Sequence, residues 1–220
     1  MSLDRILEPE YMDDPEEAEE YDAMDHTEPN RAFVNRLIEL GARGRLIDLG
    51  CGPGHITVLA AESLPHADVL GVDAARSMLR IAKARRAASP ARDRVRFLQG
   101  RVQELGLSDG SFDGVFSNTV LHHIPKPVPF LAEAGRLLAK GGVLLIRDLV
   151  RPETEDQLTA LVALHAKDAN ARQRELFRAS LHAALTPEEL AQAAKEAGLR
   201  DFEITRDSDR HMSLQIAARR

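Results

Sequence analysis

The sequence predicts an α/β protein in which a mostly parallel sheet lies between two layers of helices. Three observations lead to this prediction. Short apolar runs alternate with segments of helical periodicity, as in parallel strands joined by crossover helices. A glycine-rich turn, residues 50–54, connects the first apolar run to the helix after it. Two strand-like segments, 202–204 and 214–216, follow one another with only a polar turn between them, so we expect an antiparallel hairpin there.

Each element is justified by its periodicity and its end signals. An i, i+3, i+4, i+7 apolar spacing predicts helices over 27–40, 55–62, 76–88 and 130–138, two helices within 152–184 that are split near Asn170, and a helix over 187–198. The last of these begins with Thr186 as N-cap, a proline and two acids. Apolar runs predict strands over 45–49, 68–72, 95–98, 112–117 and 143–146, and we expect Lys140-Gly141-Gly142 to close the preceding helix.

Charge divides the 220-residue chain into two parts. Residues 1–30 carry twelve acids and one base, Arg5, so the rest of the chain has five more bases than acids although the net charge is −6. We therefore treat residues 1–40 as an acidic arm with a helix and residues 41–220 as one domain. The start is unlike a secretory signal, no apolar run is long enough for a membrane span, and Cys51 is the single cysteine. We expect a cytoplasmic protein that binds neither membrane nor nucleic acid, the latter because aromatic residues are scarce and Trp is absent.

The glycine turn and the acid after the next strand predict a nucleoside ligand. Glycines at every second position, Gly50, Gly52 and Gly54, let the backbone turn sharply and approach a ligand closely. Asp73, nineteen residues after Gly54, can accept both hydroxyls of a ribose. A tight turn without a ligand is the simpler interpretation of the glycines alone. A dinucleotide site is disfavoured because His55 stands where its fingerprint needs a third small residue.

These segments resemble the successive motifs of class I S-adenosylmethionine-dependent methyltransferases over about residues 44–147. The motifs that carry the resemblance are residues 46–54 (LIDLGCGPG), Val72-Asp73, residues 111–117 (SFDGVFS) with Leu121-His122-His123, and Leu137-Leu138 with Lys140-Gly141-Gly142. The resemblance implies a Rossmann-like three-layer sandwich with seven strands in the order 3-2-1-4-5-7-6, strand 7 being antiparallel.

The same resemblance implies where S-adenosylmethionine binds. The first motif, with Asp48, Gly50, Cys51, Gly52 and Gly54, would surround the methionine portion. Asp73 would hold the ribose, with Ala74 and Met78 beside the adenine, and Asn118 of the fourth motif is a further candidate.

One position departs from the family pattern. Where the family often has an acid that accepts from the adenine amino group, Arg101 follows Gly100, and arginine cannot accept a hydrogen bond. The backbone N–H of Val102 and the side chain of Gln103 remain candidates for this pocket wall. Arg101 is either a solvated surface residue or stacked on the adenine.

His122 and His123 are the candidate catalytic residues, because imidazole can take a proton near neutral pH. A packing role for this pair is the alternative. We expect no metal site. Residues 151–185 are expected to bind the substrate, although a helix packed on the sheet is the simpler interpretation.

Two interpretations of the acidic arm stay open. It is either a solvated charge run or a lid over the cofactor, with Tyr21 as its expected contact and its acids paired with bases of the body.

The resemblance predicts methyl transfer to a small molecule, in a monomer or a homodimer. The alternatives are a protein or nucleic-acid methyltransferase that works with a partner, and a non-catalytic S-adenosylmethionine-binding regulatory subunit.

Overall fold

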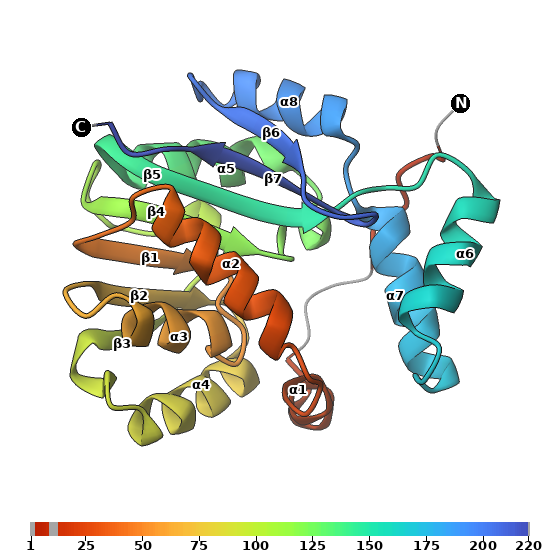
Figure 1. Ribbon diagram of the computed structural model, residues 1–220, viewed down its shortest axis with the longest axis horizontal. Helices are drawn as coiled ribbons and strands as arrows, with labels where there is room; N and C mark the ends of the chain where they lie inside the picture. Colours follow the sequence, from red (N-terminus) through yellow and green to blue (C-terminus); the bar gives the residue numbers. More distant parts are fainter. Residues whose placement is uncertain (1–2, 9–12, 220) are drawn as a thin grey trace.

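The computed structural model describes residues 3–8 and 13–219, with Glu104 described by its backbone alone. Tyr11 and Met12 of the acidic arm lie outside the described residues. Seven strands form one sheet, in the order β3-β2-β1-β4-β5-β7-β6 (Figure 1). The strands are β1 (Arg45–Leu49), β2 (Asp68–Asp73), β3 (Val95–Gln99), β4 (Phe112–Asn118), β5 (Leu138–Leu149), β6 (Glu203–Arg206) and β7 (His211–Ile216). All neighbours pair in parallel except β7, which is antiparallel to β5 and β6. The predicted fold and strand order are confirmed.

Helices cover both faces of the sheet. One layer contains α2 (Thr27–Glu39), α3 (His55–Ser63) and α4 (Arg76–Ala88), and the other contains α5 (Pro127–Leu137) and α8 (Pro187–Glu196) (Figure 1). A short helix, α1 (Pro15–Asp22), packs on α4. The pair α6 (Glu155–His165) and α7 (Ala171–Ala183) stands beyond the end of β5, and three 3₁₀ turns complete the fold: η1 (Arg92–Arg94), η2 (Val102–Glu104) and η3 (Leu121–His123).

The predicted N-cap Thr186 and the predicted helix break near Asn170 are both confirmed. Asn170 begins α7 and Thr186 begins α8, each with a reciprocal capping box in which the cap side chain accepts from the third helical N–H. The helix α1 was not predicted. Asp14 caps it by accepting from the N–H groups of Glu16 and Glu17, which satisfies donors that the helix itself leaves free.

Two predicted boundaries around β5 were wrong. The helix expected from residue 130 begins at Pro127, whose fixed φ suits the first helical position, and it ends at Leu137. The strand expected over 143–146 already begins at Leu138, so Lys140-Gly141-Gly142 lies within the strand and does not cap the helix. The reason is a bulge: Phe112 pairs with Leu138 while Gly114 pairs with Val143.

The sheet separates two apolar cores because successive side chains of a strand point to opposite faces. Leu46, Phe116 and Leu145 face α2 and α3, whereas Ile47, Val115 and Leu144 face α5 and α8. A third, smaller cluster joins α6 to α7. Within residues 3–8 and 13–219, the longest apolar helical stretch is too short or too polar for a bilayer crossing.

We expect Phe116→Ala to lower the free energy of unfolding by about 3–5 kcal/mol, because it leaves a cavity in a core with little room to collapse. Phe116 is fully buried on β4, and its ring centre lies 6.1 Å from that of Phe33 on α2. Urea unfolding followed by circular dichroism measures the change. The control Leu164→Ala removes a side chain that is 62% exposed and should cost less than about 0.5 kcal/mol. Equal losses in the two variants would contradict this assignment of the core.

Candidate functional site

The glycine loop lies at the carboxyl end of β1 and is held by β2. The N–H groups of Gly50 and Cys51 both donate to the carbonyl of Val72, at 2.8 and 2.9 Å. All three loop glycines have positive φ, and a Cβ at Gly50 would lie 2.5 Å from Val120. A Cβ at Gly52, in contrast, would meet nothing within 4 Å. The loop is therefore closely packed behind Gly50 and open beside Gly52.

Asp48 lies beneath this loop and does not face the open side. It is buried and accepts a hydrogen bond of 2.6 Å from the hydroxyl of Thr57 on α3. Burial, aided by the charge of Asp73, raises the pKa of Asp48 to about 7, although the bond from Thr57 opposes the shift. Cys51 is also buried, and burial raises its pKa. Both side chains support the loop from inside.

Asp73 joins the loop to the start of α4. One carboxylate oxygen accepts from the N–H of Gly52 at 2.7 Å, and the other accepts from the N–H of Ala75 at 2.9 Å. Burial raises the pKa of Asp73 against these two bonds. The carboxylate is thus fixed beside the open position at Gly52, and its role as a ribose acceptor stays a prediction.

Helix α1 brings Tyr21 to this carboxylate. Burial together with the charge of Asp73 raises the pKa of the Tyr21 phenol, against an opposing effect of the nearby Thr119 hydroxyl, which follows β4. Tyr21 and Ala18 pack against Met78, so α1 covers the helix α4 next to the predicted adenine wall. Part of the arm, Pro15–Asp22, is a helix that packs on α4, and its role as a lid stays a prediction.

Acids of the arm pair with bases of α4, as the lid interpretation expects. Glu19 lies 2.7 Å from Arg80, and Asp22 lies 2.5 Å from Arg85 and 2.9 Å from His55. Asp13 accepts from the N–H and the hydroxyl of Ser77, both at 3.0 Å. An ion pair as exposed as Glu19–Arg80 stabilises the contact between α1 and α4 only slightly. The apolar packing of Tyr21 and Ala18 also holds α1 on α4.

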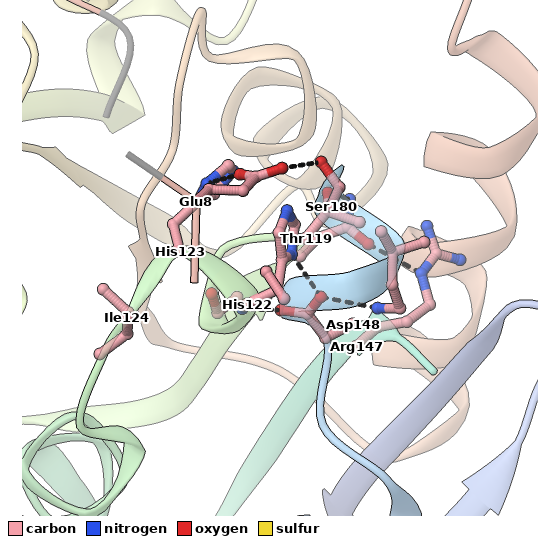
Figure 2. Close-up of polar contacts among 12 residues, drawn as sticks. Glu8, Thr119, His122, His123, Ile124, Arg147, Asp148 and Ser180 are labelled. Atoms are coloured by element: carbon pink, nitrogen blue, oxygen red, sulfur yellow. Dashed lines mark hydrogen bonds and ion pairs between the residues drawn. The ribbon is translucent and has the colours of Figure 1, made fainter. Parts of the chain in front are cut away.

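His122 forms a buried ion pair that sequence reasoning did not predict. Its Nδ1 lies 2.6 Å from Asp148, whose other oxygen accepts the His122 backbone N–H at 3.1 Å (Figure 2). Both side chains are 4% exposed. Burial alone would lower the pKa of His122, but the charge and hydrogen bond of Asp148 outweigh it and raise the pKa; the same pairing lowers that of Asp148. The one sequence signal for this ion pair is Asp148 itself, an acid near the end of the largely apolar strand β5.

His123 pairs instead with the N-terminal segment. Its Nδ1 lies 2.6 Å from Glu8, which also accepts a 2.5 Å hydrogen bond from Ser180 of α7 (Figure 2). Arg5 donates to the carbonyls of His122, Ile124 and Ala183, so residues 5–8 tie the η3 turn to α7. Ligand atoms of Glu8, His122 and His123 lie within 4.8 Å of one another, and these three are the described residues that best suit a cation. The carboxylates of Asp148 and Glu8 already pair with the two rings.

The remaining predicted cofactor residues fall around the same edge of the sheet. Asn118 ends β4 and accepts a 2.7 Å bond from Arg147. Ala74 follows Asp73, and its carbonyl accepts from Gln99. Val102 is buried in η2, whereas Arg101 before it is exposed. The structure therefore brings together the glycine loop, Asp73 and Tyr21, with Asn118 beside them, and leaves Arg101 at the surface.

The segment expected to bind substrate forms the helical pair α6 and α7. Its inner side packs as an apolar cluster of Leu149, Leu158, Leu181 and Ala184. His182 lies 3.7 Å from Glu155, and His165 lies 2.6 Å from Asp209 of the turn between β6 and β7. The two helices are thus placed beyond β5, close to His122 and to that turn.

A family model described as a methyltransferase domain matches residues 41–198. The chain belongs to this family. Among curated relatives, a demethylmenaquinone methyltransferase from Symbiobacterium thermophilum is 31% identical over 61% of this chain and 57% of its own length. A trans-aconitate 2-methyltransferase from Deinococcus radiodurans is 39% identical over 52% of this chain and 41% of its own length. The chain thus spans about two fifths to three fifths of the length of these methyltransferases.

Solved structures confirm the class I methyltransferase fold. A protein from Methanococcus maripaludis assigned to the S-adenosyl-L-methionine-dependent methyltransferases has a TM-score of 0.74 at 21% identity, with 97% of each chain covered. A Haemonchus contortus phosphoethanolamine N-methyltransferase, solved with S-adenosylhomocysteine and phosphomonomethylethanolamine, has a TM-score of 0.64 at 24% identity over 81% of this chain and 38% of its own. A [4+2]-cyclase is also similar, with a TM-score of 0.60 at 21% identity over 80% of this chain and 59% of its own. The fold by itself therefore does not fix the reaction.

We expect the pKa of His122 to lie above 6.5 and to fall below that value in Asp148→Asn, because burial then acts without the opposing charge. Histidine-selective NMR titration of both proteins measures the two values. Since the folded-state pKa is raised, the stabilisation from protonated His122 is complete below about pH 6.5 and is lost as the pH rises through the raised value. A pKa that is the same in both proteins would contradict the ion pair.

Proposed function

We propose that this protein transfers a methyl group from S-adenosylmethionine to a small-molecule acceptor. The observation that carries the proposal is the carboxylate of Asp73, fixed by Gly52 and Ala75 beside an open position of the glycine loop. A carboxylate at the end of the second strand of such a sheet suits a ribose diol. Family membership supports the same cofactor.

The residues present fit this cofactor. The open side of Gly52 leaves room for the methionine portion, and Asp73 retains acceptor capacity for ribose hydroxyls after its two backbone bonds. Tyr21 and Met78 supply an apolar wall on the α1 side. S-adenosylmethionine would supply an electrophilic methyl group on a sulfonium, and the task of the protein is to hold an acceptor in line with it.

Tyr21 and α1 act as a lid in this proposal. A sulfonium reacts more readily with a nucleophile from which water has been removed, so a cover over the reacting atoms favours transfer. Half-buried Tyr21 packs against Met78 of α4, and its hydroxyl lies near Asp73 and Thr119, so it would cover the cofactor from the α1 side. The ion pairs of α1 with α4 would hold the lid in this closed position.

The two histidines have different proposed roles. His122 is a positioning residue, because Asp148 takes both its ring and its backbone N–H and so fixes the η3 turn. His123, 30% exposed beside Glu8, is the proposed proton acceptor for an acceptor that loses a proton. The paired carboxylate of Glu8 would stabilise the charged ring.

A small acceptor suits the charge of the chain better than a nucleic acid does. The net charge is −6, and two bases of α4, Arg80 and Arg85, are already paired with acids of α1. The named relatives include enzymes whose names specify small substrates, demethylmenaquinone and trans-aconitate. A transfer assay with S-[methyl-³H]adenosylmethionine tests the proposal on panels of phenols, amines, thiols and carboxylic acids, with RNA and bulk protein in parallel. Label in a small molecule is expected, and label confined to protein or RNA would contradict it.

We expect Asp73→Asn to weaken S-adenosylmethionine binding about 10- to 100-fold, the loss of a charge-assisted hydrogen bond worth about 1.5–3 kcal/mol. Isothermal titration calorimetry measures it. Asp68→Asn is the matched control, because Asp68 is an exposed acid at the opposite end of β2. Unchanged affinity in Asp73→Asn would show that the ribose is held elsewhere.

We expect Tyr21→Ala to raise the dissociation constant of S-adenosylmethionine by about tenfold, because the apolar area that the lid buries against α4 is lost. Glu20→Ala changes the neighbouring exposed position of the same helix and should have no such effect. The same calorimetric titration compares the two. Equal affinities in both variants would favour a tail that does not contact the cofactor.

A further inference from the structure

A groove of about 540 Å³ lies on the α2 side of the sheet, between α2 and the hairpin β6–β7. Its floor is the end of β5 and the start of β7, and its walls are α2, the turn at residues 207–210 and the end of α6. The charged and histidine side chains in its lining include Arg147, Arg210, His165 and His211, together with Asp207 and Asp209.

The acids of this groove already have donors. Asp209 lies 2.6 Å from Nε2 of His165, and Asp207 accepts from the hydroxyls of Thr205 and Ser213. Glu39, at the far side, pairs with Arg36 at 3.0 Å. The lining carboxylates are therefore largely satisfied.

The guanidinium groups of Arg147 and Arg210, in contrast, have no carboxylate partner among the described residues. Arg147 donates to the amide oxygen of Asn118 and to the carbonyl of Pro29, and Arg210 stacks 5.9 Å from the ring of Phe177 with a buried Nη1 that bonds to none of the described residues. A guanidinium carries five N–H donors, so several donors of this pair have no partner among the described residues.

His211 lines the same groove as these two cations and is a neutral ring. Burial and the positive charges of Arg147 and Arg210 lower the pKa of His211 to about 4, against a weaker opposing effect of Asp148 and Asp209. Its Nδ1 is 3.0 Å from the hydroxyl of Ser208. The excess of unmatched hydrogen-bond donors is what a carboxylate or phosphate would satisfy.

The groove is joined to the proposed transfer site by hydrogen bonds. Arg147 donates to Asn118 at 2.7 Å, and Asn118 donates to the hydroxyl of Thr119 at 3.0 Å. Thr119 in turn lies near the Tyr21 hydroxyl of the lid. An anionic group bound by Arg147 would thus lie next to the end of β4, where the acceptor must approach.

We propose that Arg147 and Arg210 bind an oxyanion of the methyl acceptor, which makes the substrate a small molecule with a carboxylate or phosphate group. That the bound molecule is the methyl acceptor rests on the proposed function, whereas the anion site itself is inferred from the residues that line the groove. The two anions share their chemistry, planar or tetrahedral oxygen acceptors that suit a guanidinium fork.

Calorimetric titration with succinate and, separately, with inorganic phosphate tests the site on the full chain without S-adenosylmethionine. We expect saturable binding of at least one anion, weakened about tenfold or more in Arg210→Gln and unchanged in Arg200→Gln, an exposed guanidinium after α8. The better-bound anion identifies the acceptor class. Absence of saturable binding, or equal binding by the Arg210 variant, would overturn the proposal.

A second measurement separates this inference from the proposed function. Once an acceptor is found, the bound anion should inhibit methyl transfer competitively with the acceptor and not with S-adenosylmethionine. Arg147→Gln should then raise the KM for the acceptor more than it lowers kcat. The thermal midpoints of Arg147→Gln and Arg210→Gln should be equal, which serves as the control for folding. Anion binding without competition would overturn the acceptor role. A lack of any transfer, with anion binding intact, would count against the proposed function alone.

Discussion

The parallel register of β2, β1 and β4 is the constraint on which the candidate site depends. Leu49 lies opposite Val72, and Asp48 lies opposite Phe116, so these three strands end together at one edge of the sheet. The glycine loop, Asp73 and Asn118 each follow directly from one of these ends. Parallel pairing with helical crossovers thus brings residues 50, 73 and 118 together although they are far apart in the sequence.

Much of the fold was predictable because its signals are local. Periodicity predicted most strands and helices, and Thr186 marked a helix start by capping chemistry that depends only on neighbours in sequence. The order of the sheet came from resemblance to a family. The bulge in β5 was not predictable from Lys140-Gly141-Gly142, because the same residues end helices and interrupt strands, and the pairing of Phe112 with Leu138 decides between the two.

The candidate site was predictable where one motif supplies it and not where distant segments meet. Gly52 and Asp73 were found from their spacing, but the partner of His122 lies 26 residues away on another strand, and that of His123 lies in the N-terminal segment. Asp148 and Glu8 are single acids without a motif around them. Their roles follow only from the tertiary structure, which places the ends of β4, β5 and α7 side by side.

Strand β5 carries opposite charges on its two faces at one end. Arg147 points toward α2 and the groove, whereas Asp148 points toward the η3 turn, because neighbouring side chains of a strand alternate. A change of length in the bulge at residues 139–142 leaves this alternation intact, since the pairing resumes at Val143. A one-residue change after Val143 would exchange the two faces and put the carboxylate in the groove and the guanidinium against the histidine. Insertions or deletions in this strand are thus tolerated only in the bulge at residues 139–142. There they leave Arg147 facing the groove and Asp148 facing the histidine.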